Sequence, residues 1–200
     1  MNRKDDGTII LSLTISWKKI EAGYEKEIAK IVDNAELPGF RKGKAPRKDV
    51  EAKLNKAEIY GEAVREILPE EYEKLIKEHD LKPVMYPRVE IKKAEVGQDW
   101  EFEISTCEAP KIDLPKDSKG KTPEDLVKTV EVIIPQMLAE EEANYRLGAL
   151  SENLTKVGLN FDTFLQSKKM TVEDYKAQTI TEAKNDLKLR FLSDSLKALV

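Results

Sequence analysis

The segment Pro38-Gly39-Phe40-Arg41-Lys42-Gly43-Lys44-Ala45-Pro46 separates two helical patterns and is the most informative part of the chain. Its two glycines and two prolines predict a tight loop, because glycine adopts backbone angles that other residues avoid and proline fixes one of its own. Inside the loop Phe40 stands among the cations Arg41, Lys42 and Lys44. A phenylalanine is normally buried, so this arrangement suits docking on an anionic surface with an apolar hollow. The alternative is a solvated basic turn whose Phe40 folds back into the core.

Before the loop, apolar residues alternate with serine and threonine, which predicts a half-buried strand. The apolar positions of this strand are Ile9, Leu11, Leu13, Ile15 and Trp17. Ser16 is expected to cap the helix that leads into the loop. The apolar face predicted for that helix comprises Ile20, Tyr24, Ile28, Ile31 and Val32.

After the loop, Pro46 suits the first turn of a helix, and a helical pattern runs from Val50 to Ile67. Pro69 is expected to start another helix. Two strands follow: residues 84 to 91, where Pro87 argues for a sheet edge, and a segment with apolar residues at every second position from Trp100. Residues 1 to 112 therefore predict an α+β N-terminal domain, a small antiparallel sheet with helices.

The second half of the chain reads as helical. Residues 108 to 122 contain two prolines, a glycine and few apolar residues, which indicates a linker, placed at residues 113 to 122. Thr122, Asn160 and Thr171 are expected to cap helices, and a long helix is expected from Pro135 to Gly158. Residues 123 to 200 thus predict an all-α C-terminal domain, and the whole chain an elongated two-domain architecture. The apolar stripe expected on the last helix comprises Tyr175, Ile180, Ala183, Leu187, Phe191, Leu192, Leu196 and Leu199.

Composition limits the kinds of partner. The chain has 200 residues, of which 40% are hydrophobic and 36% charged, and a formal net charge of −4. A negative net charge means that any nucleic-acid contact must come from a local basic patch. The densest such patch is Arg41, Lys42, Lys44, Arg47 and Lys48.

The same sequence favours a cytoplasmic location without a membrane partner. It contains no apolar run of transmembrane length, and its first residues lack the apolar core of a secretory signal. Cys107 is the only cysteine, so no internal disulfide can form and a reducing compartment fits.

Catalytic chemistry has little support in the sequence. His79 is the only histidine and has no nucleophile or metal partner nearby in sequence, so a structural role is favoured. Cys107 ends a predicted strand and suits a small core residue. The sequence has neither metal-ligand spacing nor a phosphate-binding glycine loop. We therefore predict that the protein is not an enzyme and needs no cofactor.

The stretch from Gly39 to Pro46 resembles the ribosome-docking motif of the trigger factor family of bacterial chaperones, Gly-Phe-Arg-x-Gly-x-x-Pro, at every specified position. An amphipathic helix precedes it and a second helix follows. The pairs Ile134-Pro135, Gly158-Leu159 and Phe164-Leu165 also resemble the first part of that family's C-terminal substrate-binding domain. The resemblance runs from about Thr8 to Val200.

The resemblance implies an ATP-independent chaperone that docks at the ribosomal exit tunnel and holds nascent or unfolded chains, with links to protein transport and cell division. Its implied partners are the ribosome, both protein and ribosomal RNA, and unfolded polypeptides; a homodimer stays open. The implied docking residues are Gly39, Phe40, Arg41, Lys42, Gly43, Lys44 and Pro46. Client contacts are implied for Met137, Tyr145, Phe161, Phe164 and Phe191, each of which could equally be ordinary core.

The chain also departs from the family pattern. The short linker stands where the family carries a prolyl isomerase domain, so isomerase activity is expected to be missing. The C-terminal part is short, and Asn2 to Asp6 are polar where an apolar strand is usual. Two alternatives remain: a periplasmic holdase with a similar helical core, and an RNA-binding module with a helical partner domain.

Overall fold

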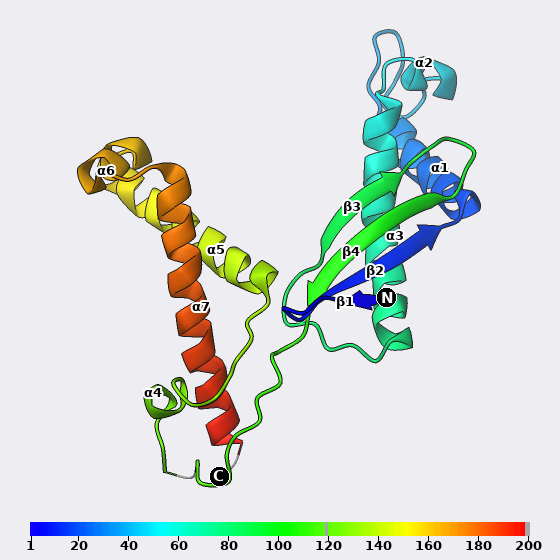
Figure 1. Ribbon diagram of the computed structural model, residues 1–200. Helices are drawn as coiled ribbons and strands as arrows, with labels where there is room; N and C mark the ends of the chain where they lie inside the picture. Colours follow the sequence, from blue (N-terminus) through cyan, green and yellow to red (C-terminus); the bar gives the residue numbers. More distant parts are fainter. Residues whose placement is uncertain (119, 199–200) are drawn as a thin grey trace. The chain divides into compact units, whose positions relative to one another are not determined.

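The computed structural model describes residues 1–118 and 120–198 (Figure 1). The chain divides into two compact units: Met1–Ile10, Lys82–Pro87 and Ser105 onward form the first, and Leu11–Leu81 with Arg88–Ile104 form the second. The boundaries predicted at residues 112 and 123 stay a prediction. The elements in chain order are β1 Asn2–Arg3, β2 Thr8–Ile15, α1 Trp17–Asn34, α2 Arg47–Glu51, α3 Lys56–Glu78, β3 Arg88–Lys93, β4 Trp100–Cys107, α4 Pro123–Leu126, α5 Gln136–Lys156, α6 Phe161–Lys168 and α7 Val172–Lys197.

The four strands form one small antiparallel sheet in the order β1-β2-β4-β3 (Figure 1). β1 pairs with β2 in the register Asn2 to Ile10 and Arg3 to Ile9. The sequence did not predict β1, because its two residues are polar. Main-chain hydrogen bonds supply the pairing, and the Gly7 turn returns the chain at a φ of +85°.

The alternation predicted for the two central strands is confirmed. Ile9, Leu11 and Ile15 of β2 are buried, as are Trp100 and the other apolar residues of β4. Trp17, predicted as the last strand residue, instead begins α1. Ser16 occupies the N-cap position as expected, although its side chain makes no capping hydrogen bond.

Helices α1 and α3 pack together on one face of the sheet (Figure 1). They approach closely at Gly23, where a Cβ atom would lie 2.7 Å from Ile67 Cδ1 and 3.2 Å from Ala63 Cβ. Tyr60 of α3 stacks on Tyr24 of α1 with ring centroids 4.4 Å apart. These contacts fix α1 against α3, and α1 leads directly into the loop between α1 and α2.

The helical pattern after the loop divides differently from the prediction. It breaks before Asn55, whose side chain accepts a hydrogen bond from Ala57 N (3.1 Å) and caps α3. Pro69 was predicted to start a helix, but it lies inside α3. A proline there removes a hydrogen bond and costs about 3 kcal/mol in an isolated helix. The helix nevertheless continues to Glu78, and beyond the proline it still contacts α1, where Lys19 Nζ lies 2.9 Å from Glu71 Oε1.

The strand predicted at residues 84 to 91 begins later than expected. β3 starts at Arg88, so Pro87 precedes the strand instead of interrupting it. Pro83 forms only an isolated bridge to Glu108. The predicted edge position is confirmed, because β3 is the last strand in the sheet order.

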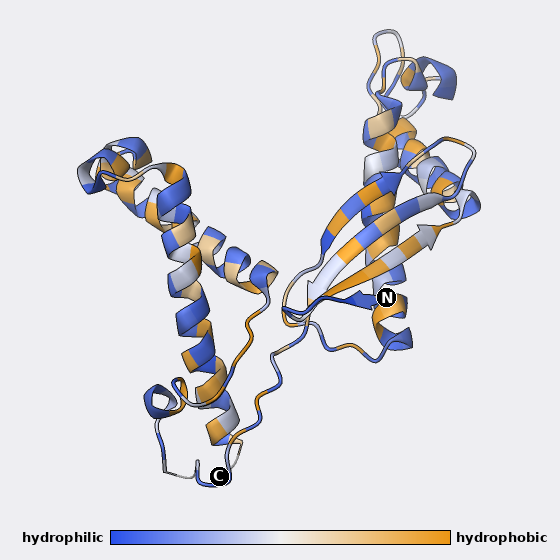
Figure 2. Ribbon diagram, in the orientation of Figure 1, coloured by the Kyte–Doolittle hydropathy of each residue, from blue (hydrophilic) through white to orange (hydrophobic). Residues whose placement is uncertain are grey.

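In the first unit α5 and α7 pack against each other, and hydrophobic residues recur among hydrophilic ones along α7 (Figure 2). The predicted caps are confirmed: Thr122, Asn160 and Thr171 each accept a backbone hydrogen bond at the start of α4, α6 and α7. Leu199, assigned to the last apolar stripe, lies outside the described residues. The buried core here comprises Leu126, Val130, Val132, Ile134, Ala139, Leu187 and Leu192.

Candidate functional site

The loop between α1 and α2 is closed at its base by backbone hydrogen bonds. Gly43 N donates to Ala35 O (3.0 Å), which joins the two sides of the loop. Nearer the tip, Phe40 N donates to Leu37 O (3.0 Å) and Lys44 N donates to Arg41 O (2.9 Å). The loop is therefore a sequence of hydrogen-bonded turns.

Both glycines of the loop have positive φ, but for different reasons. Gly39 has a φ of +88° and no atom within 4 Å of the position that a Cβ would take. Gly43 has a φ of +68°, and a Cβ there would lie 2.5 Å from the backbone oxygen of Asp33. Gly39 is thus needed for its backbone angle alone, whereas Gly43 also permits two backbone segments to meet.

The far side of the loop is anchored in the core. The side chains of Ala45 and Val50 are buried. Pro46 is the N-cap residue of α2, and its carbonyl accepts hydrogen bonds from Asp49 N (3.0 Å) and Val50 N (3.3 Å). The prediction that Pro46 lies at the start of a helix is confirmed.

Phe40 is 45% exposed at the tip of this loop. Arg41, Lys42 and Lys44 are also exposed, and within the described part of the chain their side chains form no ion pair or hydrogen bond. An aromatic ring and three uncompensated positive charges therefore share one anchored loop.

Arg47 behaves differently from the other cations of the predicted basic patch. Its Nη1 and Nη2 atoms lie 2.6 and 2.9 Å from the carboxylate oxygens of Glu25, and its Nε also binds Glu51. The hydrogen bonds to Glu25 and Glu51 raise the pKa of Arg47, and the hydrogen bonds from Arg47 lower the pKa of Glu25. Arg47 thus stabilises the base of the loop and contributes little free charge. Local sequence patterns did not predict the Arg47–Glu25 ion pair, because Glu25 lies in the preceding helix, α1.

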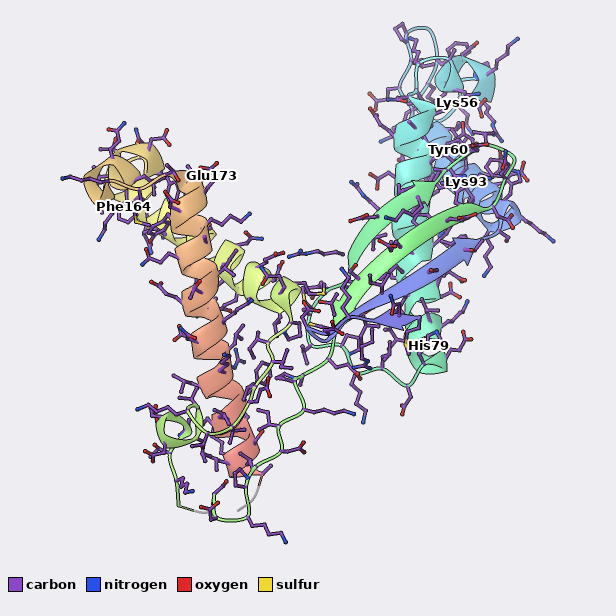
Figure 3. All side chains as sticks on the ribbon, viewed as in Figure 1. Lys56, Tyr60, His79, Lys93, Phe164 and Glu173 are labelled. Carbon is purple, nitrogen blue, oxygen red and sulfur yellow. The ribbon has the colours of Figure 1, made fainter. Side chains whose placement is uncertain are left out.

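The residues considered for client contacts differ in exposure. Tyr145 is 75% exposed, whereas Met137 is only 4% exposed and is not available to a partner. Phe161 and Phe164 are half-buried and pack edge-on against Tyr175, with ring centroids 6.0 and 5.5 Å away. Figure 3 labels Phe164 on α6 and Glu173 in the first turn of α7.

Tyr145 and Phe191 also line an open groove of about 680 Å³ in the first unit. Sequence reasoning missed Tyr86, which is 92% exposed on the rim of this groove. The sequence feature that could have identified Tyr86 is its position directly before Pro87, in a segment that also contains Pro83. The full lining comprises Pro83, Val84, Met85, Tyr86, Leu138, Glu141, Glu142, Tyr145, Leu187, Arg190, Phe191 and Asp194.

The groups considered for catalysis have structural positions. His79 is the C-cap residue of α3. Cys107 is fully buried, and burial raises the pKa of its thiol to about 11, assisted by the negative charge of Asp6. Across residues 1–118 and 120–198, no group of three or more His, Cys, Asp or Glu could hold a metal ion. No helix in the same residues is long and apolar enough to cross a bilayer.

Two family patterns match the chain. The pattern of bacterial trigger factor protein (TF) matches residues 1–148, and that of the bacterial trigger factor C-terminus matches residues 108–198. The chain therefore belongs to the bacterial trigger factor family, which confirms the resemblance seen in the loop motif.

Individual relatives agree with this membership. Trigger factor of Staphylococcus carnosus (strain TM300) is 28% identical over 174 residues, which cover 82% of this chain and 38% of that protein. Trigger factor of Staphylococcus saprophyticus is 30% identical over 154 residues, covering 77% and 34%. Trigger factor of Natranaerobius thermophilus is 34% identical over 110 residues, covering 55% and 25%. The matched parts thus span about a third of the length of these relatives.

One solved structure is also similar. It comes from work on promiscuous substrate recognition in the folding and assembly activities of the trigger factor chaperone. The match has 20% identity and a TM-score of 0.45, and it covers 76% of this chain and 34% of the other.

Proposed function

We propose that this chain is an ATP-independent chaperone of the cytoplasm that docks on the ribosome at the exit tunnel and holds emerging or unfolded chains. The observation that carries the docking role is the exposed Phe40 flanked by Arg41, Lys42 and Lys44 on an anchored loop. Family membership supports this reading over a periplasmic holdase or a separate RNA-binding module.

The chemistry of the loop suits a mixed surface of RNA and protein. An arginine can bind a phosphate or carboxylate with two parallel hydrogen bonds, and lysines add point charges. Burying the 45% of Phe40 that is still exposed would contribute about 1 kcal/mol, since a whole phenylalanine side chain is worth about 1.5–3 kcal/mol. If the three cations bind phosphates, the logarithm of the binding constant should fall with that of the salt concentration with a slope of about −2 to −3.

We further propose that residues 123 to 200 form an all-helical domain that holds client chains. Tyr145 and Phe191 in the groove, with Tyr86 at its rim, offer the apolar contacts for this role. Phe161 and Phe164 are secondary candidates because Tyr175 already covers part of each ring. Holding would be passive, and we expect no acceleration of proline-limited refolding.

The docking proposal is tested by pelleting with purified bacterial ribosomes. The variant Phe40→Ala/Arg41→Ala/Lys42→Ala should lose co-sedimentation at physiological salt while its circular dichroism stays unchanged. The three side chains are exposed and make no ion pair within the described residues, so the fold should not depend on them. Pelleting of this variant at the level of the unchanged chain would refute the docking role.

A matched control removes an exposed apolar residue and two lysines elsewhere in the second unit. Ile91 is 58% exposed on β3, Lys18 is exposed on α1, and Lys93 ends β3. The variant Lys18→Ala/Ile91→Ala/Lys93→Ala should pellet like the unchanged chain. Equal losses in both variants would show that general charge, not the loop, determines binding.

A further inference from the structure

Helix α5 has its first backbone donor satisfied by a residue that is far away in sequence. Asp6 Oδ2 accepts a hydrogen bond from Gln136 N, the first residue of the helix, at 3.0 Å. The N-cap residue of α5 is Pro135, which offers no side-chain oxygen. The first backbone N–H groups of any helix lack partners within the helix. Asp6 therefore supplies a cap that the local sequence cannot provide.

The same carboxylate also holds its own turn. Asp6 Oδ1 accepts from Thr8 N and Asp6 Oδ2 accepts from Thr8 Oγ1, both at 3.0 Å. Backbone bonds from Lys4 N to Thr8 O (2.8 Å) and from Gly7 N to Lys4 O (3.0 Å) close the turn between β1 and β2. One side chain is thus part of two structures, the turn and the start of α5.

Two further contacts lie beside this junction, all within the first unit. A Cβ on Gly7 would lie 3.4 Å from Pro135 Cγ, so the turn rests against the residue before α5. Arg3 Nη2 of β1 lies 2.8 Å from Glu108 Oε2. These contacts keep the turn in place for Asp6 to reach Gln136.

We propose that the shared carboxylate of Asp6 couples the β1–β2 turn to the first turn of α5, so that local opening of either one destabilises the other. Burial alone would raise the pKa of Asp6, but the hydrogen bonds from Gln136 and Thr8 outweigh it and the pKa is lowered. The carboxylate is therefore ionised at neutral pH, which also suits its place beside the positive end of the helix dipole.

Amide hydrogen exchange of the full chain, followed by NMR, first tests whether Asp6 caps α5, which the coupling requires. Asp6→Ala should speed exchange of the Gln136 amide and the rest of the first turn of α5 about fivefold, the size of effect expected when a helix cap is lost. Asp5→Ala is the matched control, because Asp5 is an exposed neighbour of equal charge that makes no described hydrogen bond. Unchanged exchange in α5 relative to this control would overturn the proposal.

Gln136→Pro tests the coupling itself. Proline is well tolerated at the first position of a helix, so the variant removes the donor N–H and leaves α5 able to form. The amides of Lys4 and Gly7, which close the turn, should then exchange faster by about twofold or more, the lower end of a lost cap hydrogen bond. Unchanged exchange at these two amides would reduce Asp6 to a local cap and reject the coupling. If Asp6→Ala does not fold, Asp6→Asn and Gln136→Pro still decide between these outcomes.

Discussion

Gly39 and Gly43, in the loop between α1 and α2, permit a comparison that separates backbone strain from steric contact. In both Gly39→Ala and Gly43→Ala a side chain must adopt a positive φ, which costs about 1–2 kcal/mol for an L-residue. Gly39 has open space around the added methyl group, so its variant should lose only this amount. At Gly43 the methyl group would lie 2.5 Å from Asp33 O, so that backbone must also move. Overpacking of this kind adds about 1–3 kcal/mol, which gives a total of about 2–5 kcal/mol for Gly43→Ala.

Urea unfolding followed by tryptophan fluorescence measures this difference. Trp17 and Trp100 are the chain's two tryptophans, and both lie in the second unit together with the loop. The free energy of unfolding should fall at least 1 kcal/mol further for Gly43→Ala than for Gly39→Ala, with an unchanged denaturant slope. Values equal to within 0.5 kcal/mol, roughly the additivity error of such measurements, would refute the claim that Gly43 is required by the contact with Asp33.

Two other expectations follow from charge and burial. Hydrogen bonds from Lys26 and Lys30 hold the pKa of Glu66 at about 2, below the ordinary value of about 4.3. This carboxylate therefore stabilises the fold above pH 4.3 and loses that effect as the pH falls toward 2. Glu66→Gln should lower the thermal midpoint at pH 7 by more than at pH 2.5, and an equal decrease at both pH values would contradict the ion pairs assigned to Glu66. Burial raises the pKa of Cys107 to about 11. At pH 8 the smaller thiolate fraction alone should make its reaction with a disulfide reagent about 200-fold slower in the folded chain than in urea. Labelling of the folded chain as fast as in urea would show that the thiol is accessible.

Local sequence signals predicted those parts of the structure that local interactions determine. The caps at Thr122, Asn160 and Thr171 were found because each cap and its partner lie within three residues. The alternation in the two central strands was found because each has one face buried in the sheet core. The positions of both loop glycines also fitted the positive φ that the structure shows.

Features that depend on distant contacts were missed. Pro69 was assigned to a helix start because sequence alone does not show α1 packing beside it. The cap of α5 escaped notice because Asp6 and Gln136 are 130 residues apart. Helical periodicity could not show that Met137 is buried while Tyr145 is exposed, since both lie on the same amphipathic helix. In each case the sequence does not show which distant part of the chain packs against the residue.

The borders of the sheet have a consequence for a protein proposed to work among extended, unpaired chains. An open strand edge can recruit such chains by continuing the backbone ladder, and charged or very short edge strands prevent this. β1 has only two residues, Asn2 and Arg3, and β3 carries a charge at Arg88, Glu90, Lys92 and Lys93. Both edge strands therefore disfavour β-pairing with the backbone of another chain, so the protein can contact unfolded polypeptides without nucleating their aggregation.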